Sequence, residues 1–427
     1  MTDRHLPISS HSCAAADTPV ASPLAKVLAG LIALAIAMGI GRFAFTPLLP
    51  MMLQDAGLSI SGAAWLASAN YLGYLIGALS AMGLRLVPPR AIRAGLVLIV
   101  IATFAMGYTQ SFQAWLCLRL IAGVASAWVL IAVSAWSLAA LAVYQKPLFS
   151  SMVFSGVGCG MAVAGIASLV QTERHAGSAT TWMALGLMAA TATALVWRYF
   201  RADQTLASVA ADAASAGGNG SKRFQWNSDA IRLVCCYGVF GFGYIIPATF
   251  LPVMAKNLLQ DSSLFAWLWP VFGLAAAVST LLVAVLVRTM SRRHIWMLSQ
   301  LLMAFGIVLP VVSPQLLTVF VASLCVGGNF MIITLVALQE ARQTAGHNSD
   351  YAGHHAATLI AAMTSAFACG QIIGPLTINA TLNGNARFSS GLVMAAVLLA
   401  LATLLLRKPL RKPASDKLQI FNQGVKR

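Results

Sequence analysis

Long apolar runs, separated by short polar connections, make up most of this chain. A helix needs about 20 largely apolar residues to cross a bilayer. Runs of that kind lie near 27–52, 61–84, 92–110, 112–141, 148–170 and 180–200. After a polar gap they resume near 231–256, 264–287, 293–313, 315–338, 356–381 and 388–406. The pattern predicts an all-α polytopic membrane protein with twelve transmembrane helices in two six-helix bundles.

The polar stretches divide the chain into five parts. We expect a disordered cytoplasmic tail at 1–25, helical bundles at 26–200 and 231–407, a cytoplasmic linker at 201–230 and a basic cytoplasmic tail at 408–427. The linker contains Gly217-Gly218-Asn219-Gly220-Ser221, which is typical of a flexible connection. It is not a phosphate loop, because Lys222 follows Ser221 rather than preceding a Ser or Thr, and no strand comes before it.

The two groups of apolar runs repeat each other. Gly39-Ile40-Gly41, followed by Leu49-Pro50, recurs as Gly241-Phe242-Gly243, followed by Leu251-Pro252. At the same offset, Ala64-Trp65-Leu66 returns as Ala266-Trp267-Leu268. Two consecutive helices in one register indicate duplication of a six-helix unit. Parallel repeats of this kind are typical of transporters whose halves rock around a site near the bilayer midplane.

Composition and charge agree with a membrane protein. The chain is 59% hydrophobic and 9% charged, with a mean hydropathy of +0.81, whereas soluble domains carry about 25% charged residues. The 27 Lys and Arg outnumber the 11 Asp and Glu, but they gather in the connections, which argues against nucleic-acid binding. With both termini in the cytoplasm, the opposite side carries only Arg174, Lys256 and Arg387, as the positive-inside rule requires.

Two arginines interrupt the apolar runs. Arg42 lies about halfway through the first run and Arg119 lies within the fourth, and no Asp or Glu occurs in the runs to neutralise them. An Arg at bilayer depth costs about 2.5–3.5 kcal/mol on insertion scales, so it is usually retained for function. Paired N–H donors suit Arg to bind a carboxylate, phosphate or sulfate. The alternative is structural: each guanidinium bonds backbone carbonyls left free at a proline or a helix break.

A few other polar side chains lie within the runs and are candidates for lining a substrate path. They are Asn70, Tyr71, Tyr74, Tyr244, Asn329 and Gln371. Tyr71 and Asn70 lie three and four residues before Tyr74, so both share a helix face with it. Hydrogen bonding between helices is the alternative for each of them.

Glycine and proline recur at equivalent places in the two halves. The positions are Gly39, Gly41, Pro47 and Pro50, and then Gly241, Gly243, Pro247 and Pro252. They predict kinked or locally unwound helices. Paired broken helices indicate the binding region and the parts that bend.

The acidic residues map to tails, loops and run ends, so no intramembrane carboxylate is available to carry a proton. Three possibilities follow. The proton travels with the anion, or the carrier exchanges anions, or Asp55 or Glu340 reaches in from a helix end. His354 and His355 are the best titratable alternatives. The seven cysteines show no metal-ligand spacing, so we expect no metal, disulfide or cofactor.

One string in the first run is distinctive. Gly41-Arg42-Phe43-Ala44-Phe45-Thr46-Pro47-Leu48-Leu49-Pro50, followed by Asn70-Tyr71-Leu72-Gly73-Tyr74-Leu75-Ile76-Gly77, resembles the bacterial YbfB/YjiJ-type subfamily of the major facilitator superfamily. The resemblance covers residues 26–407. It implies an inner-membrane transporter whose first and fourth helices flank a central cavity.

Two superfamily patterns are present and a third is incomplete. The fourth run contains Arg119-Leu120-Ile121-Ala122-Gly123, and the fifth contains Gly156-Val157-Gly158-Cys159-Gly160 and then Gly165. Between the second and third runs, Gly83, Arg90 and Arg93 stand near their expected places, but the usual Asp is absent. That departure affects the expected gating contacts and leaves the expected fold unchanged.

These observations predict a secondary active transporter of a small solute that works by alternating access. The favoured substrate is a small organic anion bound near Arg42 and Arg119. The alternative is export of neutral or amphipathic compounds, such as a sugar or drug, with both arginines structural.

A membrane enzyme would need a membrane Asp pair, His-Glu-x-x-His or Gly-x-Ser-x-Gly, and none occurs. The repeated halves and the mobile helices argue against a channel or a sensor. We expect a monomer in the bacterial inner membrane, with protons as a candidate coupling ion.

Overall fold

The computed structural model describes residues 22–83, 87–142, 144, 146–200, 226–258, 262–345, 352–380 and 387–407. Within these ranges the regular structure is helical throughout. The first half contains α1 (Pro23–Leu34), η1 (Ala35–Phe43), α2 (Phe45–Asp55), α3 (Ile60–Gly83), α4 (Pro88–Tyr108), α5 (Phe112–Ala142), α6 (Pro147–Glu173), α7 (Ser178–Val196) and η2 (Trp197–Phe200). The second half contains α9 (Ser228–Leu258), α10 (Ser262–Thr289), α11 (Arg292–Val312), α12 (Leu316–Thr344), α13 (Ala352–Ala380) and α14 (Arg387–Leu406).

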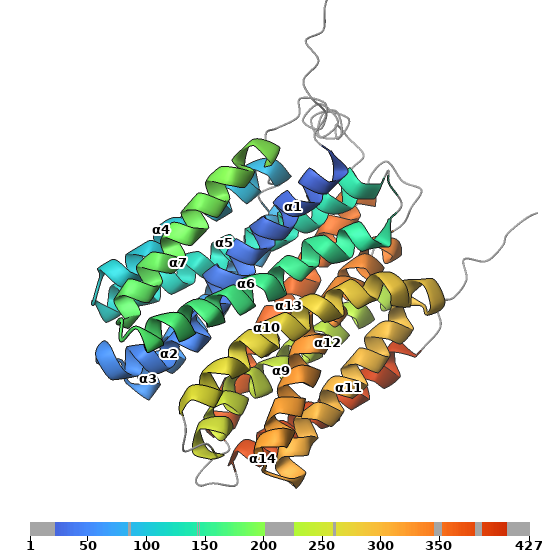
Figure 1. The fold of residues 1–427 in the computed structure, drawn as a ribbon. Helices are drawn as coiled ribbons and strands as arrows, with labels where there is room; N and C mark the ends of the chain where they lie inside the picture. Colours follow the sequence, from blue (N-terminus) through green and yellow to red (C-terminus); the bar gives the residue numbers. More distant parts are fainter. Residues whose placement is uncertain are drawn as a thin grey trace, which may run out of the picture.

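The helices form two bundles that lie side by side (Figure 1). The blue-to-green bundle holds α1 to α7, and the yellow-to-red bundle holds α9 to α14. α1, η1 and α2 together make one membrane-length segment, Pro23–Asp55. Counted this way, the described residues contain one helix for each of the twelve predicted runs, so the predicted fold class is confirmed. The expected tails lie mostly, and the expected linker largely, outside the described residues.

Eleven of these helices are long and apolar enough to cross a membrane. The helix outside that set, α3, has 24 residues but carries Asn70, Tyr71 and Tyr74 within its length. Asn70 and Tyr74 are buried, so these polar groups are turned toward protein rather than lipid. α3 therefore counts as the twelfth membrane helix despite its lower hydropathy.

Proline and small polar side chains begin several of the helices. Pro23, Pro88 and Pro147 stand in the first turn of α1, α4 and α6, where the missing N–H costs no hydrogen bond. The Ser22 hydroxyl accepts a bond from the Ala25 amide at 3.3 Å. Asp55, at the end of α2, accepts bonds from the backbone amide and the hydroxyl of Ser178 at the start of α7. That carboxylate ties the first and last membrane helices of the first half together.

The two bundles meet along α6 and α10 and along α3 and α13. Glycine makes the first contact close: a Cβ added to Gly158 would lie 2.3 Å from the Ala277 nitrogen. One added to Gly273 would lie 2.4 Å from the Ala162 nitrogen. Small residues allow helix backbones in membranes to approach in this way.

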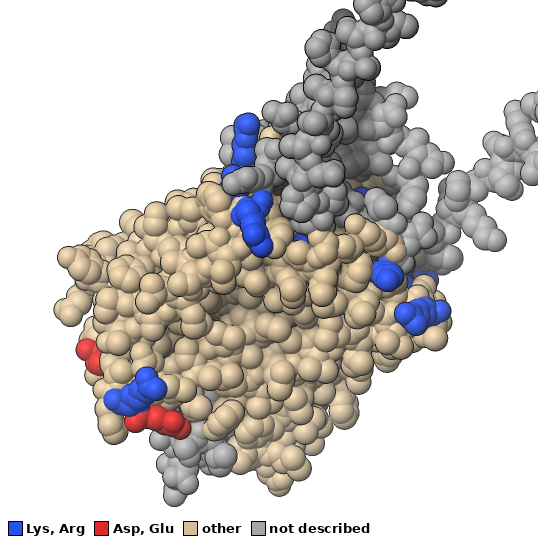
Figure 2. All heavy atoms as spheres, turned by 45° about the horizontal axis from the view of Figure 1, so that its top comes forward, with Lys and Arg blue, Asp and Glu red and all other residues tan. Residues whose placement is uncertain are grey.

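The sides of the molecule are apolar and its ends are charged. Leu195, Phe305 and Leu274 are 72%, 61% and 59% exposed, as lipid-facing side chains would be. On the face shown in Figure 2, most of the basic side chains lie at one end, and the acidic ones lie at the opposite end beside a further basic side chain. The uncharged band between them is the part of the surface that a bilayer can cover.

Candidate functional site

The first membrane helix changes its winding at the string that stood out in the sequence. η1, from Ala35 to Phe43, is a π-helix that contains Gly39, Gly41 and Arg42. Wide turns of this kind are rare and are found frequently at functional sites. In π winding, the Arg42 carbonyl would take its bond from the amide five residues on, and that residue is Pro47, which has no N–H. The carbonyls at the end of η1 therefore need donors from elsewhere.

Arg119 of α5 supplies those donors. Its Nη1 lies 3.3 Å from the Gly41 carbonyl oxygen and its Nη2 lies 3.1 Å from that of Arg42. Its guanidinium also lies 4.9 Å from the centre of the Phe45 ring. Asn70 of α3 donates to the Arg119 carbonyl at 2.9 Å, and thus links α3 to the same assembly. These contacts favour the structural alternative for Arg119, which braces the altered helix.

Arg42 has a different environment. It is 2% exposed, and its guanidinium lies 3.7 Å from the centre of the Tyr74 ring, with Tyr71 and Phe43 at 5.6 and 5.5 Å. Its Nη2 donates to Oε1 of Gln371 on α13. Its Nε and Nη1 are buried without a hydrogen-bond partner among the described residues. Buried charged donors are costly when unpaired, so Arg42 retains binding capacity that Arg119 has largely used.

Gln371 brings the second bundle into the site. It is completely buried, and its Nε2 has no partner within the described part of the chain. The Arg42 and Gln371 side chains therefore meet across the boundary between the two bundles, with one guanidinium and one amide still offering donors.

An aromatic cluster in the second half continues the site. The Tyr244 and Phe330 rings stack at 4.2 Å, and Phe330 meets Phe43 edge-on at 5.8 Å. Phe367 lies 6.2 Å from Tyr244. The Tyr244 hydroxyl is buried and lacks a partner among the described residues. Phe43, Phe330 and Phe367 were not among the residues singled out from the sequence, since nothing distinguishes them there from ordinary core aromatics.

The predicted site residues thus fall into three groups. Arg42, Tyr71, Tyr74 and Gln371 meet directly, and Tyr244 joins them through Phe330 and Phe43. Arg119 and Asn70 support the backbone beneath Arg42. Asn329 stands apart, because its amide donates to the Cys325 carbonyl of its own helix at 2.8 Å.

The glycine and proline positions differ between the halves. In the first half Gly39 and Gly41 lie in the π-helix, Pro47 lies in the first turn of α2, and Pro50 lies inside α2. In the second half, α9 keeps α-helical winding through Gly241, Gly243, Pro247 and Pro252, so no π-helix matches η1 there, and a hinge at these positions stays a prediction. A physical reason is the supply of donors: α12 has no arginine before Arg342, near its end, and so offers no counterpart of Arg119.

Asp55 and Glu340, the two carboxylates considered for the proton, bind elsewhere in the structure. Asp55 holds the start of α7. Glu340 accepts a bond from Arg293 at 2.6 Å, and Arg293 also pairs with Asp229. Neither Asp55 nor Glu340 contacts Arg42 or Arg119 in this conformation. The described residues contain no cluster of His, Cys, Asp and Glu suited to a metal.

Comparison with known proteins identifies the family of this chain. Residues 34–407 match the model of a family described as "Uncharacterised MFS-type transporter YbfB", where MFS denotes the major facilitator superfamily. Among solved structures, that of the human organic anion transporter MFSD10 (TETRAN) is similar, with a TM-score of 0.68 and 16% identity over 91% of this chain and 100% of that one. At this identity the likeness establishes the fold alone. No curated protein matches the sequence.

Proposed function

The chain belongs to the YbfB-type transporter family of the major facilitator superfamily, and on that premise we propose that it carries a small organic anion by alternating access. Family and fold support a multi-pass membrane transporter of a small solute. The anionic substrate, the roles of individual residues, the inner-membrane location, the cytoplasmic termini and the monomeric state are parts of the proposal.

The observation that carries the proposal is the environment of Arg42. A buried guanidinium with two unpartnered donors lies where the two bundles meet, and no described carboxylate contacts it. A carboxylate, sulfonate or phosphate fits because its oxygens accept charge-assisted bonds from such donors. The neighbouring rings of Tyr74, Phe43 and Phe330 favour an anion with a planar apolar body. The solved relative is named as an organic anion transporter, which agrees with this substrate class.

The position of Arg42 also suggests how binding drives movement. In this structure Arg42 bonds to Gln371 of the opposite bundle. An anion that takes over the guanidinium donors would loosen that contact or bridge it, and so would change the balance between arrangements of the two halves. A ligand shifts such a balance only through different affinities for the two states. A bond that crosses the boundary provides that difference.

Coupling follows from the lack of acidic partners. With Asp55 and Glu340 bound elsewhere, we propose that the substrate either brings its own proton or exchanges with a second anion. Proteoliposomes with an imposed pH gradient separate these two modes. Proton co-transport gives uptake that follows the gradient, whereas exchange requires anion inside the vesicle and ignores the gradient.

The direct test is thermal stabilisation of the purified protein by small aromatic and aliphatic carboxylates, each paired with its neutral amide. We expect carboxylates to raise the melting temperature of the wild type and to leave Arg42→Ala unchanged. Gly328→Ala is a suitable control, since a Cβ there has 3.9 Å to its nearest neighbour. If the amides stabilise wild type and Arg42→Ala equally, the anion proposal fails.

Failure in that form would favour the second candidate, export of neutral or amphipathic compounds. The specific observation behind it is the aromatic cluster of Tyr244, Phe330, Phe367 and Phe43, which gives an apolar surface beside the site. Arg42 would then serve to hold Gln371 and Tyr74, and neutral aromatic compounds would stabilise the protein.

A further inference from the structure

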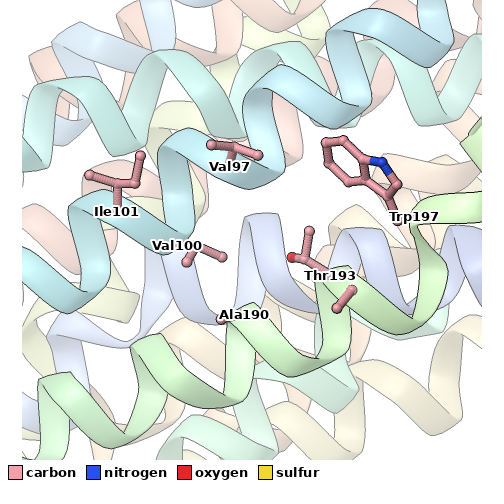
Figure 3. A pocket seen from close by; sticks show the side chains of 7 residues that line it. Val97, Val100, Ile101, Ala190, Thr193 and Trp197 are labelled. Carbon is pink, nitrogen blue, oxygen red and sulfur yellow. The ribbon is translucent and has the colours of Figure 1, made fainter.

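An apolar groove lies on the outer side of the first bundle, away from the candidate site. It has a volume of about 410 Å³ and is lined by Val97, Val100, Ile101, Ala190, Thr193, Ala194 and Trp197. Figure 3 shows the side chains of α4 and α7 facing each other across it, with the Trp197 indole at one end. Val97 and Ile101 are 39% and 57% exposed. In Figure 1, α4 and α7 lie on the side opposite the second bundle, so this groove opens toward lipid.

Arginines cluster at the Trp197 end of the groove. The Arg93 guanidinium lies 4.7 Å from the centre of the Trp197 ring and donates to the Trp197 carbonyl at 2.9 Å. Arg198, the next residue along the chain, is exposed, as is Arg90 one turn before Arg93. Residues 88–200 contain a single acid, Glu173, which ends α6 at the other end of the bundle. Asp203 lies outside the described residues.

A third feature lies one turn deeper. Thr193 is 6% exposed, and its hydroxyl is buried with no hydrogen-bond partner among the described residues. Helical threonine normally bonds a carbonyl three or four residues back. Four residues separate Thr193 from Trp197, which is about 6 Å along the helix. In order of depth, arginine side chains thus stand beside the Trp197 end of the groove, one hydroxyl lines it a turn deeper, and apolar side chains line the rest.

A phospholipid has a phosphate, ester oxygens and acyl chains in the same order of depth. We propose that the groove binds an anionic phospholipid of the surrounding bilayer. The phosphate lies between Arg90 and Arg198, an ester oxygen reaches the Thr193 hydroxyl, and one acyl chain lies along Val97, Val100 and Ile101. Basic pockets between transmembrane helices bind anionic headgroups in this way. Arg93 is the positioning residue, because it holds the Trp197 indole against the groove. The proposal depends on the membrane fold and is independent of the transported solute.

The test is native mass spectrometry of the purified full-length protein with added phosphatidylglycerol or phosphatidylcholine. Wild type is expected to retain one tightly bound phosphatidylglycerol in preference to phosphatidylcholine. The double substitution Arg90→Gln and Arg198→Gln lowers that preference, by about fivefold for each arginine. Ala190→Phe fills the groove and lowers binding of both lipids.

Two control variants place the same changes elsewhere. Arg288→Gln removes an exposed arginine at the end of α10, and Val397→Phe enlarges a side chain that is 50% exposed on α14. Both should bind lipid as wild type does. The preference is a ratio within one variant, so partial unfolding does not mimic its loss. If the arginine variant keeps the wild-type preference, or Ala190→Phe keeps the wild-type occupancy, the proposal is overturned.

Discussion

Arg119 directs two of its guanidinium nitrogens to backbone oxygens of η1, at 3.3 Å from Gly41 and 3.1 Å from Arg42. Arg42, one helix away, directs a single nitrogen to Gln371 and stacks on Tyr74. The two side chains have the same chemistry and similar burial. Their partners give them different roles. Arg119 binds backbone carbonyls and so fixes a conformation, whereas Arg42 has unpartnered donors that can bind a ligand.

Arg119→Met should therefore destabilise the protein. The substitution keeps much of the volume but removes the bonds that Arg119 donates to the Gly41 and Arg42 carbonyls, and each buried unsatisfied group costs about 1–3 kcal/mol. We expect the free energy of unfolding in detergent to fall by about 2–4 kcal/mol, measured by thermal or denaturant unfolding. Arg42→Met is the matched comparison and should cost less, because two of its donors lack partners already. Equal losses would show that the two arginines share one role.

Arg42→Lys tests whether the site needs the planar guanidinium group rather than a positive charge alone. Lysine keeps the positive charge, but its ammonium can neither present two parallel N–H groups nor stack flat on Tyr74. If the proposed anion site is correct, the affinity for a carboxylate falls about tenfold or more, as expected for the loss of a charge-assisted bond. Titration calorimetry on the two purified proteins measures it. Unchanged affinity would mean that charge alone is sufficient there.

At the scale of the element, the π-helical winding of η1 depends on the helices that pack against it. The π-helical stretch from Ala35 to Phe43 passes over α6, where a Cβ on Gly39 would lie 2.3 Å from the Gly160 Cα. The Ser126 hydroxyl of α5 donates to the Ala37 carbonyl at 2.8 Å. Glycine on one side and donors on the other allow the wide helix to exist among close neighbours.

Gly39→Ala should push η1 away from α6. The methyl group meets backbone atoms, which cannot rotate aside, and overpacking of this kind costs about 1–3 kcal/mol. We expect a lower melting temperature and weaker carboxylate stabilisation, because Arg42 lies on the displaced segment. Gly328→Ala, which meets nothing closer than 3.9 Å, is the control. A Gly39→Ala protein as stable as this control would contradict the packing described.

At the scale of the whole molecule, two of the contacts between the halves differ in kind. α6 and α10 pack backbone to backbone through Gly158 and Gly273, and Arg42 bonds to Gln371 across the boundary. The first contact is close and apolar, and the second is a single polar bond. Alternating access requires the halves to move about such contacts without separating.

Gly158→Val should impair that movement. Its side chain would enter α10, since a Cβ alone would lie 2.3 Å from the Ala277 nitrogen and 2.5 Å from the Gly273 oxygen. We expect transport in proteoliposomes to fall at least about tenfold, because the closely packed arrangement of the halves becomes inaccessible. Melting temperature is followed in parallel. Wild-type transport in a folded Gly158→Val protein would show that the halves never need this contact.

Much of the architecture could be predicted from the residues. Apolar runs of bilayer length fix the helices, because in lipid each backbone group must find its partner within the segment. The repeat of Gly39-Ile40-Gly41 indicated two similar halves. The positive charge of Arg42 within the first apolar run indicated a functional residue there. Asn70, Tyr71 and Tyr74 are visible in the sequence as polar side chains within an apolar run, which predicted either a substrate path or bonds between helices.

The roles of the site residues follow only from the tertiary structure, because they depend on which residues distant in the chain come into contact. The residues show that Arg42 and Arg119 are unneutralised, but only the fold places Arg119 against the Gly41 and Arg42 carbonyls and Arg42 against Gln371, 329 positions away in the chain. The same holds for α9, which has matching glycines and prolines but keeps α-helical winding where the first half has a π-helix. A helix opens only where outside donors replace its lost bonds, and the supply of donors is a property of its neighbours.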